Sequence, residues 1–286
     1  MNQLKSIETM LPLNNGYQIP CVGYGTYKVP PQEAKAAVLT AIRAGYRHID
    51  TAAYYRNETE VGQAVRECGL PRSSLFLTSK VWNTDRGYDR TRAAFERSLR
   101  LLETEYLDLY LIHWPANYYQ YGAQARDLNA ETWRALEDLY REGKVRAIGL
   151  SNFLPHHIEA LMDRAEVRPM VDQVELHPGW LQRSVLRYCG EHDIVVEAWS
   201  PLGRKEILSH PVIAAAAEKY RRTSAQICLR WALQHGALPL PRSVAPERIQ
   251  ANTELFDFTL EKADMEALDA LVNIGGQCAR PDDVSF

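Results

Sequence analysis

Residues 75–113, LFLTSKVWNTDRGYDRTRAAFERSLRLLETEYLDLYLIH, carry the pattern from which the fold can be predicted. Two short apolar runs, LFLTSK and LDLYLIH, flank a segment in which Phe95, Leu99 and Leu102 recur at helical spacing. Both runs are almost continuously apolar, which is typical of strands buried on both faces, as in a parallel sheet. The stretch therefore predicts one strand–helix–strand unit with parallel strands.

The same alternation extends in both directions along the chain. The helical patterns between the strands have the expected start and stop residues, for example Pro31 near the start of one helix and Gly45 just past its end. Eight such units predict an α/β protein with a (β/α)8 (TIM) barrel, in a single domain over residues 1–286. The six further strand patterns are CVGYGT from Cys21, YRHID from Tyr46, VRAIGLS from Val145, MVDQVE from Met170, IVVEAW from Ile194 and ALPLP from Ala237.

The segment before the first strand, TMLPLNNGYQIP, contains the pair Asn15–Gly16. This dipeptide is favoured in type I′ turns, which join the two strands of tight hairpins. We expect an N-terminal β-hairpin that caps the bottom of the barrel.

The composition of the chain argues against some classes of binding partner. The net charge of the 286-residue chain is -3 and no basic block occurs, so neither nucleic acid nor an anionic membrane is an expected partner. No apolar run approaches the ~20 residues that cross a bilayer, and the first residues do not resemble a secretory leader. The five cysteines are scattered, which indicates neither a disulfide framework nor a metal site. We expect a cytoplasmic protein with reduced thiols.

Four chemically active residues stand where successive strands of the barrel should end. They are Asp50, Lys80 and His113 at three strand ends, with Tyr55 five positions after the first. Barrel enzymes work at the carboxyl ends of their strands. An ammonium group near a phenol lowers the pKa of the phenol, so Lys80 is expected to tune Tyr55 as an acid while Asp50 holds Lys80. His113 is suited to positioning a substrate oxygen or relaying a proton.

Each residue also has an ordinary structural interpretation. Asp50 and Lys80 form a structural ion pair in that view, Tyr55 is a surface tyrosine, and His113 is a satisfied core histidine. Taken singly, these interpretations are favoured. Together, four such residues at neighbouring strand ends favour a catalytic site that delivers protons.

Five sequence blocks, in order, resemble the aldo-keto reductases. They are DTAAYY after Asp50, TSKVWNTD around Lys80, DLYLIHWP around His113, IGLSNF around Ser151, and PRSVAPERIQAN from Pro241. The resemblance covers essentially the whole chain, from the NNG hairpin to the tail. It implies a (β/α)8 barrel that binds a nicotinamide cofactor without a Rossmann fold, in keeping with the lack of a GxGxxG motif after a strand. It also implies that Tyr55 donates a proton to a carbonyl group, Lys80 and Asp50 tune Tyr55, and His113 orients the carbonyl.

The resemblance also identifies residues for the cofactor. Trp199 replaces a tyrosine that usually stacks on the nicotinamide, and Ala251 stands where an acidic or amide residue usually precedes the adenine-binding Asn252. Arg242, Ser243 and Arg248 provide the cations and hydroxyl that suit a 2′-phosphate, so NADPH is expected rather than NADH. The residues expected to bind the rest of the cofactor are Thr26, Ser151, Asn152, Gln173, Trp199, Ser200 and Leu202.

The substrate pocket is expected to have aromatic walls, formed by Tyr27, Tyr54, Trp82, Trp114 and Tyr118, the last on a long loop after the fourth strand. Such walls favour aldehydes and ketones, including aromatic aldehydes, α-keto esters and dicarbonyls. The tail after residue 273 is short, which in the family accompanies an open site and broad specificity.

Two other functions remain open. A metal-dependent hydrolase would use His48, Asp50, His113 and His177, but Lys80 would then place a positive charge beside the ion, so no metal is expected. A nicotinamide-binding subunit or redox sensor without catalysis is the second alternative. The expected partner is a small carbonyl compound, and the expected oligomeric state is a monomer.

Overall fold

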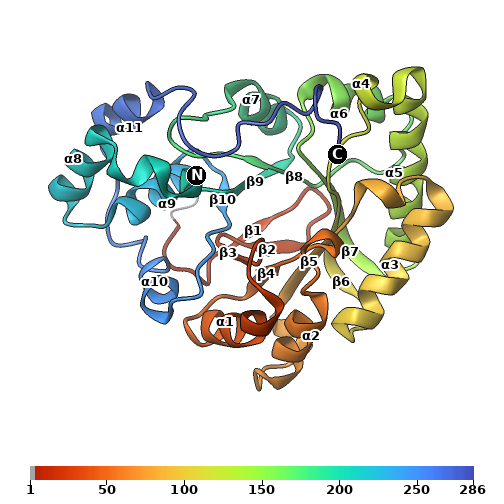
Figure 1. Cartoon of the computed structure of the whole chain (residues 1–286), viewed down its shortest axis with the longest axis horizontal. Coiled ribbons are helices and arrows are strands. Elements are labelled where there is room, and N and C mark those ends of the chain that lie inside the picture. The colour runs from red at the N-terminus through yellow and green to blue at the C-terminus, as the bar shows by residue number, and fades with distance from the viewer. Residues whose placement is uncertain (1–3) are drawn as a thin grey trace.

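A computed structural model describes residues 4–286; Met1–Gln3, which belong to the predicted domain, lie outside the described residues. Eight parallel strands form the centre of the molecule, in the order in which they occur along the chain (Figure 1). All eight predicted strands are present, and the (β/α)8 barrel is confirmed. Their bounds are β3 Gly23–Gly25, β4 His48–Asp50, β5 Phe76–Val81, β6 Leu107–Ile112, β7 Val145–Ser151, β8 Val171–Glu175, β9 Val195–Trp199 and β10 Leu238–Pro239.

The barrel closes between its first and last strands. The backbone N–H of Gly25 in β3 donates a hydrogen bond to the carbonyl of Pro241, just after β10, at 3.1 Å. A Cβ atom on Gly23 would lie 2.5 Å from Leu240 Cδ2 and 2.6 Å from His48 Nδ1. Glycine is therefore required where the two strands approach each other.

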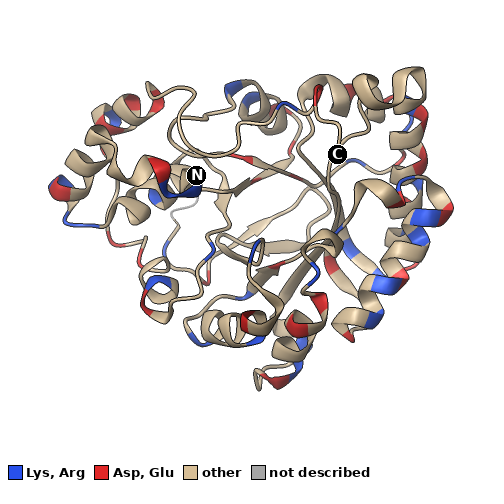
Figure 2. Cartoon of the chain, in the orientation of Figure 1, with Lys and Arg blue, Asp and Glu red and all other residues tan. Residues whose placement is uncertain are grey.

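Helices surround the strands (Figure 1). The first begins at Pro31 and is followed by Gly45 with a φ of +102°, as the sequence pattern predicts. Charged side chains lie mostly on these helices, whereas the strands carry few (Figure 2). The helix bounds are α1 Pro31–Arg43, α2 Glu58–Glu67, α3 Tyr88–Leu102, α4 Tyr118–Tyr121, α5 Ala125–Arg141, α6 Pro155–Met162, α7 Arg183–Glu191, α8 Pro211–Tyr220, α9 Ser224–Gln234, α10 Pro246–Ala251 and α11 Lys262–Asp269.

An N-terminal hairpin precedes the barrel, as expected. Its strands are β1 Met10–Pro12 and β2 Gln18–Pro20. The predicted type I′ turn is wrong, because Gly16 has a φ of +84° but Asn15 does not have a positive φ. Gly16 N–H instead donates to the Leu13 carbonyl at 2.8 Å, and a single left-handed glycine after such a turn is the other common hairpin geometry.

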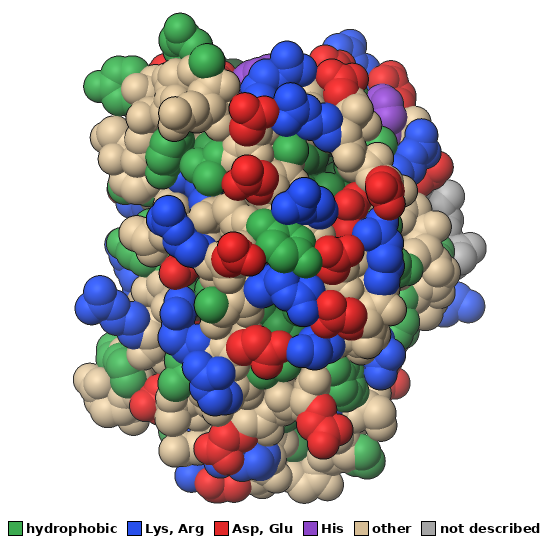
Figure 3. Space-filling view, turned by 90° about the vertical axis from the view of Figure 1, so that its right-hand side faces the viewer, with side chains coloured by type: hydrophobic (Ala, Val, Ile, Leu, Met, Phe, Trp, Pro, Cys, Tyr) green, Lys and Arg blue, Asp and Glu red, His purple; other side chains and the backbone are tan. Residues whose placement is uncertain are grey.

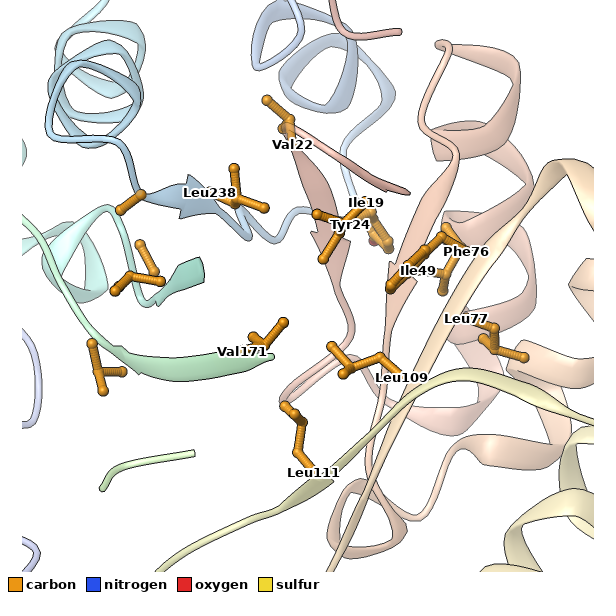
Figure 4. Packing of buried hydrophobic residues seen from close by; sticks show 14 of the residues in the cluster. Ile19, Val22, Tyr24, Ile49, Phe76, Leu77, Leu109, Leu111, Val171 and Leu238 are labelled. Carbon is orange, nitrogen blue, oxygen red and sulfur yellow. The ribbon is translucent and has the colours of Figure 1, made fainter. Parts of the chain in front are cut away.

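The hairpin seals the end of the barrel where the strands begin. The side-chain amide of Asn14 donates to the Pro169 carbonyl at 2.9 Å, and that of Asn15 donates to the Arg146 carbonyl at 3.0 Å. Ile19 is fully buried and belongs to the same apolar cluster as the strand residues around it (Figure 4). Hydrogen bonds and apolar packing thus close the bottom of the barrel and leave the opposite end for a site.

The face formed by α3 and α5 carries interspersed charges of both signs (Figure 3). Several of these charges are paired across the two helices and the turn that follows α5, for example Arg92 with Glu142 and Lys144 with Glu96. Among residues 4–286, no helix combines the length and apolar character needed to cross a bilayer. The five cysteines are free.

Candidate active site

A pocket of about 430 Å³ opens at the carboxyl ends of the strands. Asp50, Tyr55 and His113 line it, and Lys80 lies directly behind them. Asp50 ends β4, Lys80 is the last residue but one of β5, and His113 directly follows β6. Tyr55 ends the short 3-10 helix η1 Ala53–Tyr55. The structure therefore brings together the four residues that the sequence singles out.

Lys80 is the centre of this cluster. Its side chain is fully buried, and Nζ donates to both oxygens of Asp50 at 2.7 Å and to the Thr51 carbonyl at 2.9 Å. Nζ is also 3.3 Å from the Tyr55 hydroxyl. A buried ammonium needs partners on every side to offset its lost hydration, and this arrangement provides them.

A buried asparagine shapes the turn that carries Tyr55. The side chain of Asn57 donates to the carbonyls of Thr26 and Val29 at 3.0 and 3.2 Å, and it accepts from the Thr51 hydroxyl at 2.8 Å. These bonds tie the end of β4 to the loop after β3. The position of Tyr55 beside Lys80 is consequently fixed by the backbone segment that carries it, in addition to the contact of its own hydroxyl with Lys80.

The expectation that the pKa of Tyr55 lies below that of an ordinary phenol is wrong for this structure. Burial raises the pKa of the Tyr55 phenol well above 10, and the carboxylate of Asp50 and the nearby Tyr27 raise it further. The charge of Lys80 is already matched by Asp50 at 2.7 Å, so it does not offset the effect of burial. Tyr55 is therefore held in its protonated form.

His113 is held as a neutral imidazole. Burial lowers its pKa well below 6.5, and the positive charges of Lys80 and Arg86 lower it further. Its ring lies edge-on to the rings of Tyr55 and Trp82, with centroids 5.7 and 5.0 Å away. A neutral imidazole in this place can donate a hydrogen bond without carrying charge.

The residues expected to bind the nicotinamide lie together: Ser151 and Trp199 end β7 and β9, Asn152 follows β7, and Gln173 is in the middle of β8. The amide of Asn152 donates to the His113 carbonyl at 2.9 Å and to Ser151 Oγ at 3.0 Å, and its oxygen accepts from Trp199 Nε1 at 2.8 Å. Gln173, beside them, also lines the pocket. The structure thus provides an indole ring and amide groups on one wall.

The loop after β9 forms the next part of the pocket. Ser200 and Leu202 line it, as expected, and so do Arg204 and Lys205, which the sequence analysis did not single out. The basic pair in SPLGRK was the signal that could have identified them. Ser200, Arg204 and Lys205 have φ values of +47°, +54° and +78°, so this loop is held in a left-handed backbone conformation.

Not every expected cofactor residue lines the pocket. Arg242 does, whereas Ser243 lies behind it and accepts a hydrogen bond from Arg248 Nε at 3.2 Å. Asn252 is buried at the end of α10. Thr26 is fully buried, and its hydroxyl donates to the Asp50 carbonyl at 2.9 Å, so it supports the strand end from outside the pocket.

Aromatic side chains form the opposite wall, as expected. Tyr54 stacks on Trp82 with ring centroids 3.9 Å apart, and Tyr27 lies 5.1 Å from the ring of Tyr55. Trp114 completes this wall.

The placement of Tyr118 in the pocket wall is wrong, because its side chain is 79% exposed. Tyr118 begins the four-residue helix α4, which is capped by the side chain of Asn117 and carries the tyrosine away from the pocket. A short helix of this kind gives no periodic signal in the sequence, so its direction could not be predicted.

The C-terminal residue occupies the pocket in place of Tyr118. The ring of Phe286 lies parallel to Trp82 at 6.2 Å and edge-on to Trp114 at 5.1 Å. Its carbonyl accepts from the Asn83 amide at 2.7 Å, and Asn117 donates to two other carbonyls of the tail. The tail therefore forms part of the pocket wall, and no local pattern in the tail indicates this path.

The histidines considered for a metal site do not converge on one point. His48 bonds to Thr78 inside the barrel at 2.9 Å, and His177 contacts the Pro178 carbonyl at 3.0 Å. Within the part of the chain that the structure describes, the one group with suitable spacing for an ion is His156, His157 and Asp282. Leu154 N–H donates to Nδ1 of His157 at 3.2 Å, so the Nε2 atom facing Asp282 carries the proton and is not a free ligand.

The fold and the site define a barrel enzyme with a cluster of Asp50, Tyr55, Lys80 and His113 at the carboxyl ends of its strands. A family model described as "Aldo/keto reductase family" matches residues 21–273. The chain belongs to this family of oxidoreductases.

Individual relatives agree with this assignment. The chain is 47% identical to the glyoxal reductase of Bacillus subtilis (strain 168), over 98% of this chain and 99% of that protein. It is similar to the crystal structure of an aldo/keto reductase from Brucella melitensis, with 45% identity and a TM-score of 0.86, over 92% of this chain and 99% of that one. It is also similar to the Bombyx mori aldo-keto reductase solved in complex with NADP, with 34% identity and a TM-score of 0.85, over 94% of each chain.

Proposed function

We propose that this protein reduces aldehydes and ketones to alcohols with NADPH, and that Tyr55 is the proton donor. The observation that carries the proposal is the cluster in which Lys80 Nζ lies 2.7 Å from Asp50 and 3.3 Å from the Tyr55 hydroxyl, beside neutral His113. The geometry suits delivery of a single proton to an oxygen atom in the pocket.

The pocket fits a nicotinamide cofactor. Trp199 offers a stacking surface, and the oxygen of Gln173 receives no hydrogen bond from the described protein. Arg204, Lys205 and Arg242 bring positive charge to the other part of the pocket, which suits phosphate groups and favours NADPH over NADH. When bound, the cofactor supplies the hydride for the carbonyl carbon.

The side chains supply the rest of the chemistry. Tyr55 gives its proton to the carbonyl oxygen as negative charge develops there, and Lys80 stabilises the phenolate that remains. His113, being neutral, donates a hydrogen bond to the same oxygen and orients the carbonyl. Asp50 holds Lys80 in place through their ion pair at 2.7 Å. A buried phenol with a raised pKa stays protonated until the oxygen becomes basic enough to take the proton.

The aromatic wall favours flat or small carbonyl compounds. Tyr54, Trp82, Trp114 and Phe286 provide apolar contact area on the substrate side. Relatives of this chain are named glyoxal reductase and, in Trypanosoma cruzi, 9,11-endoperoxide prostaglandin H2 reductase. We therefore propose aromatic aldehydes, α-keto esters and dicarbonyls as substrates.

We also propose that residues 1–286 act as one barrel domain and as a cytoplasmic monomer. The mixed charges of Figure 3 support a surface without an apolar interface on that face. Elution of the purified chain at the volume of its 32.6 kDa mass would agree with this proposal, and elution as a dimer would contradict it.

The first experiment measures oxidation of NADPH, by the absorbance of the reduced nicotinamide, with an aromatic aldehyde, methylglyoxal, a β-keto ester and an aldose. We expect turnover that prefers NADPH to NADH. Tight binding of NADPH without turnover on any substrate would instead indicate a non-catalytic binding protein.

Tyr55→Phe tests the acid. We expect kcat to fall by about 10²–10⁴-fold, the usual contribution of a positioned general acid, with the Kd for NADPH unchanged. Tyr54→Phe is a matched control on the neighbouring tyrosine, whose hydroxyl forms no hydrogen bond in the described structure. Full turnover by Tyr55→Phe would rule out Tyr55 as the proton donor.

A further inference from the structure

A buried carboxylic acid lies behind the pocket and has no role in the chemistry described above. Glu197, in the middle of β9, is fully buried. Its Oε2 accepts a hydrogen bond from the Gln173 amide at 2.8 Å. Its Oε1 has no hydrogen-bond partner among residues 4–286.

The unpartnered oxygen faces an unpartnered nitrogen. His48 Nδ1 lies 3.6 Å from Glu197 Oε1, which is longer than a hydrogen bond, and it too lacks a partner in the described part of the chain. Burial lowers the pKa of His48 to about 3, so its ring is neutral. When the proton of the neutral ring lies on Nε2, toward Thr78, Nδ1 is an acceptor, and the O–H of a protonated Glu197 would point at it.

The charges around Glu197 also favour the acid form. The groups that face it are His48 on β4, Gln173 on β8, and the ion pair of Asp50 with Lys80 on β4 and β5. That ion pair is already neutral as a whole, so an ionised Glu197 would leave an unmatched charge in the barrel interior. Burial raises the pKa of Glu197 to about 8, and the carboxylate of Asp50 raises it too.

Two carboxyl groups together determine how the Gln173 amide is turned. Its Nε2 donates to Asp50 Oδ2 at 2.9 Å and to Glu197 Oε2 at 2.8 Å. Asp50, paired with Lys80, is only an acceptor, so the nitrogen and not the oxygen of the amide must face it. Both N–H groups are then used, and Oε1 remains as the free acceptor of a residue that lines the pocket.

We propose that Glu197 is a positioning residue for cofactor binding: it holds the second N–H of Gln173, so that Gln173 Oε1 is presented to the carboxamide N–H of the nicotinamide. This inference rests on the proposed use of NADPH. Without Glu197, one buried N–H of Gln173 loses its acceptor, and a single hydrogen bond remains to orient the amide.

The test compares Glu197→Met with Glu197→Gln in the full chain. Glutamine retains the carbonyl for Gln173 and puts an N–H₂ toward His48, so it mimics the protonated acid, whereas methionine has a similar shape and no acceptor. Each variant is titrated with NADPH and with its 3-acetylpyridine analogue, in which a methyl group replaces the amide nitrogen. Quenching of tryptophan fluorescence reports binding, since Trp82, Trp114 and Trp199 line the pocket.

The readout is the ratio of the two Kd values. We expect the unmodified protein and Glu197→Gln to bind NADPH about tenfold more tightly than the analogue, and Glu197→Met to lose most of that ratio. Gln173→Leu should lose it too. If thermal denaturation shows that Glu197→Met is not folded, Glu197→Leu takes its place.

The other results are distinguishable. An unchanged ratio in Glu197→Met overturns the inference, and so does an equal loss of affinity for both cofactors, which would indicate a purely structural role. An unmodified protein that binds neither cofactor would instead refute the proposed function itself.

Discussion

The two ends of the barrel differ in the kind of side chain that they bury. At the end where the strands begin, the hairpin buries Ile19, and the amides of Asn14 and Asn15 are used on backbone carbonyls. At the end where the strands finish, Lys80 and Asp50 bury charge instead. Charges are retained there although apolar side chains would be easier to bury.

Because of this difference, the residues that stabilise the fold and the residues that form the site lie at opposite ends of the barrel. Apolar packing at the closed end stabilises the fold and contacts no substrate. At the open end polar side chains line the pocket, among them Asp50, Tyr55 and Asn152. Substitutions at the closed end should therefore change the free energy of unfolding, and most substitutions at the open end should change kcat or KM.

Lys80→Met should be an exception, because we expect this one substitution at the open end to lower both kcat and the free energy of unfolding. We expect kcat to fall by about 10²–10⁴-fold, because the partner of Tyr55 is lost. We also expect the free energy of unfolding to fall by about 3–5 kcal/mol, because the Asp50 carboxylate is left buried without its ammonium. Turnover assays and urea denaturation measure the two effects.

The matched control is Lys35→Met, which removes an ion pair with Glu67 whose two side chains are 37% and 53% exposed. Exposed pairs contribute at most about 1 kcal/mol, so little should change. An equally small loss of stability in Lys80→Met would show that the buried pair is not needed to hold the open end together.

Ile19→Ala should affect the closed end alone. Removing a fully buried side chain of this size costs about 2–5 kcal/mol of unfolding free energy. The kcat of the folded enzyme should stay within about twofold, since Ile19 lies at the opposite end from the pocket. Met10→Ala in the same hairpin, at a residue 44% exposed, should cost only about 0.5 kcal/mol. A large loss of kcat in Ile19→Ala would mean that the two ends are coupled.

Glu197 belongs to neither end, and its proton makes stability depend on pH. The pKa of this carboxyl is about 8 in the folded protein against an ordinary 4.5, so the folded state binds more protons between these values. Its contribution to stability is complete below about 4.5 and is lost as the pH rises toward 8. Glutamine does not titrate, so Glu197→Gln should gain stability relative to the unmodified protein across this window, by on the order of a few kcal/mol.

Denaturation by urea at about pH 5 and about pH 9 measures this difference. Asp138→Asn is a suitable control, because Tyr88 and then Arg141 lower the pKa of that carboxyl below its ordinary 3.8, so its protonation does not change between these two pH values. A constant difference between Glu197→Gln and the unmodified protein at the two pH values would show that Glu197 does not carry a proton in the folded state.

Much of the fold followed from local sequence patterns. All eight strands were predicted because each is short, apolar and bounded by turn residues, and three catalytic candidates were found because they stand at strand ends. Asp50, Lys80 and His113 come from three different strands. They meet only because the barrel pairs these strands in a fixed register, which local sequence patterns do not show.

What was missed depends on contacts between distant segments. Phe286 reaches the pocket through Asn83 and Asn117, which are 203 and 169 positions away. Glu197 looks like any strand residue until its neighbours across the barrel are known. The expected lowering of the Tyr55 pKa failed for a similar reason, because the sequence does not show how far the fold removes this phenol from water, and burial is the main cause of its raised pKa.

Phe286→Ala should give the smallest effect and the sharpest test of the open end. The variant keeps the terminal carbonyl that bonds to Asn83 but loses the ring that packs on Trp82 and Trp114. An aromatic contact of this kind contributes about 0.5–1.5 kcal/mol, so the KM for an aromatic aldehyde should rise up to about tenfold. The KM for methylglyoxal, which is too small to use the ring, should hardly change. Phe286 is half-exposed, so the free energy of unfolding should also stay constant. If both KM values rose equally, Phe286 would be maintaining the shape of the whole pocket and not contacting the substrate. Its role would then be structural, like that of the residues at the closed end.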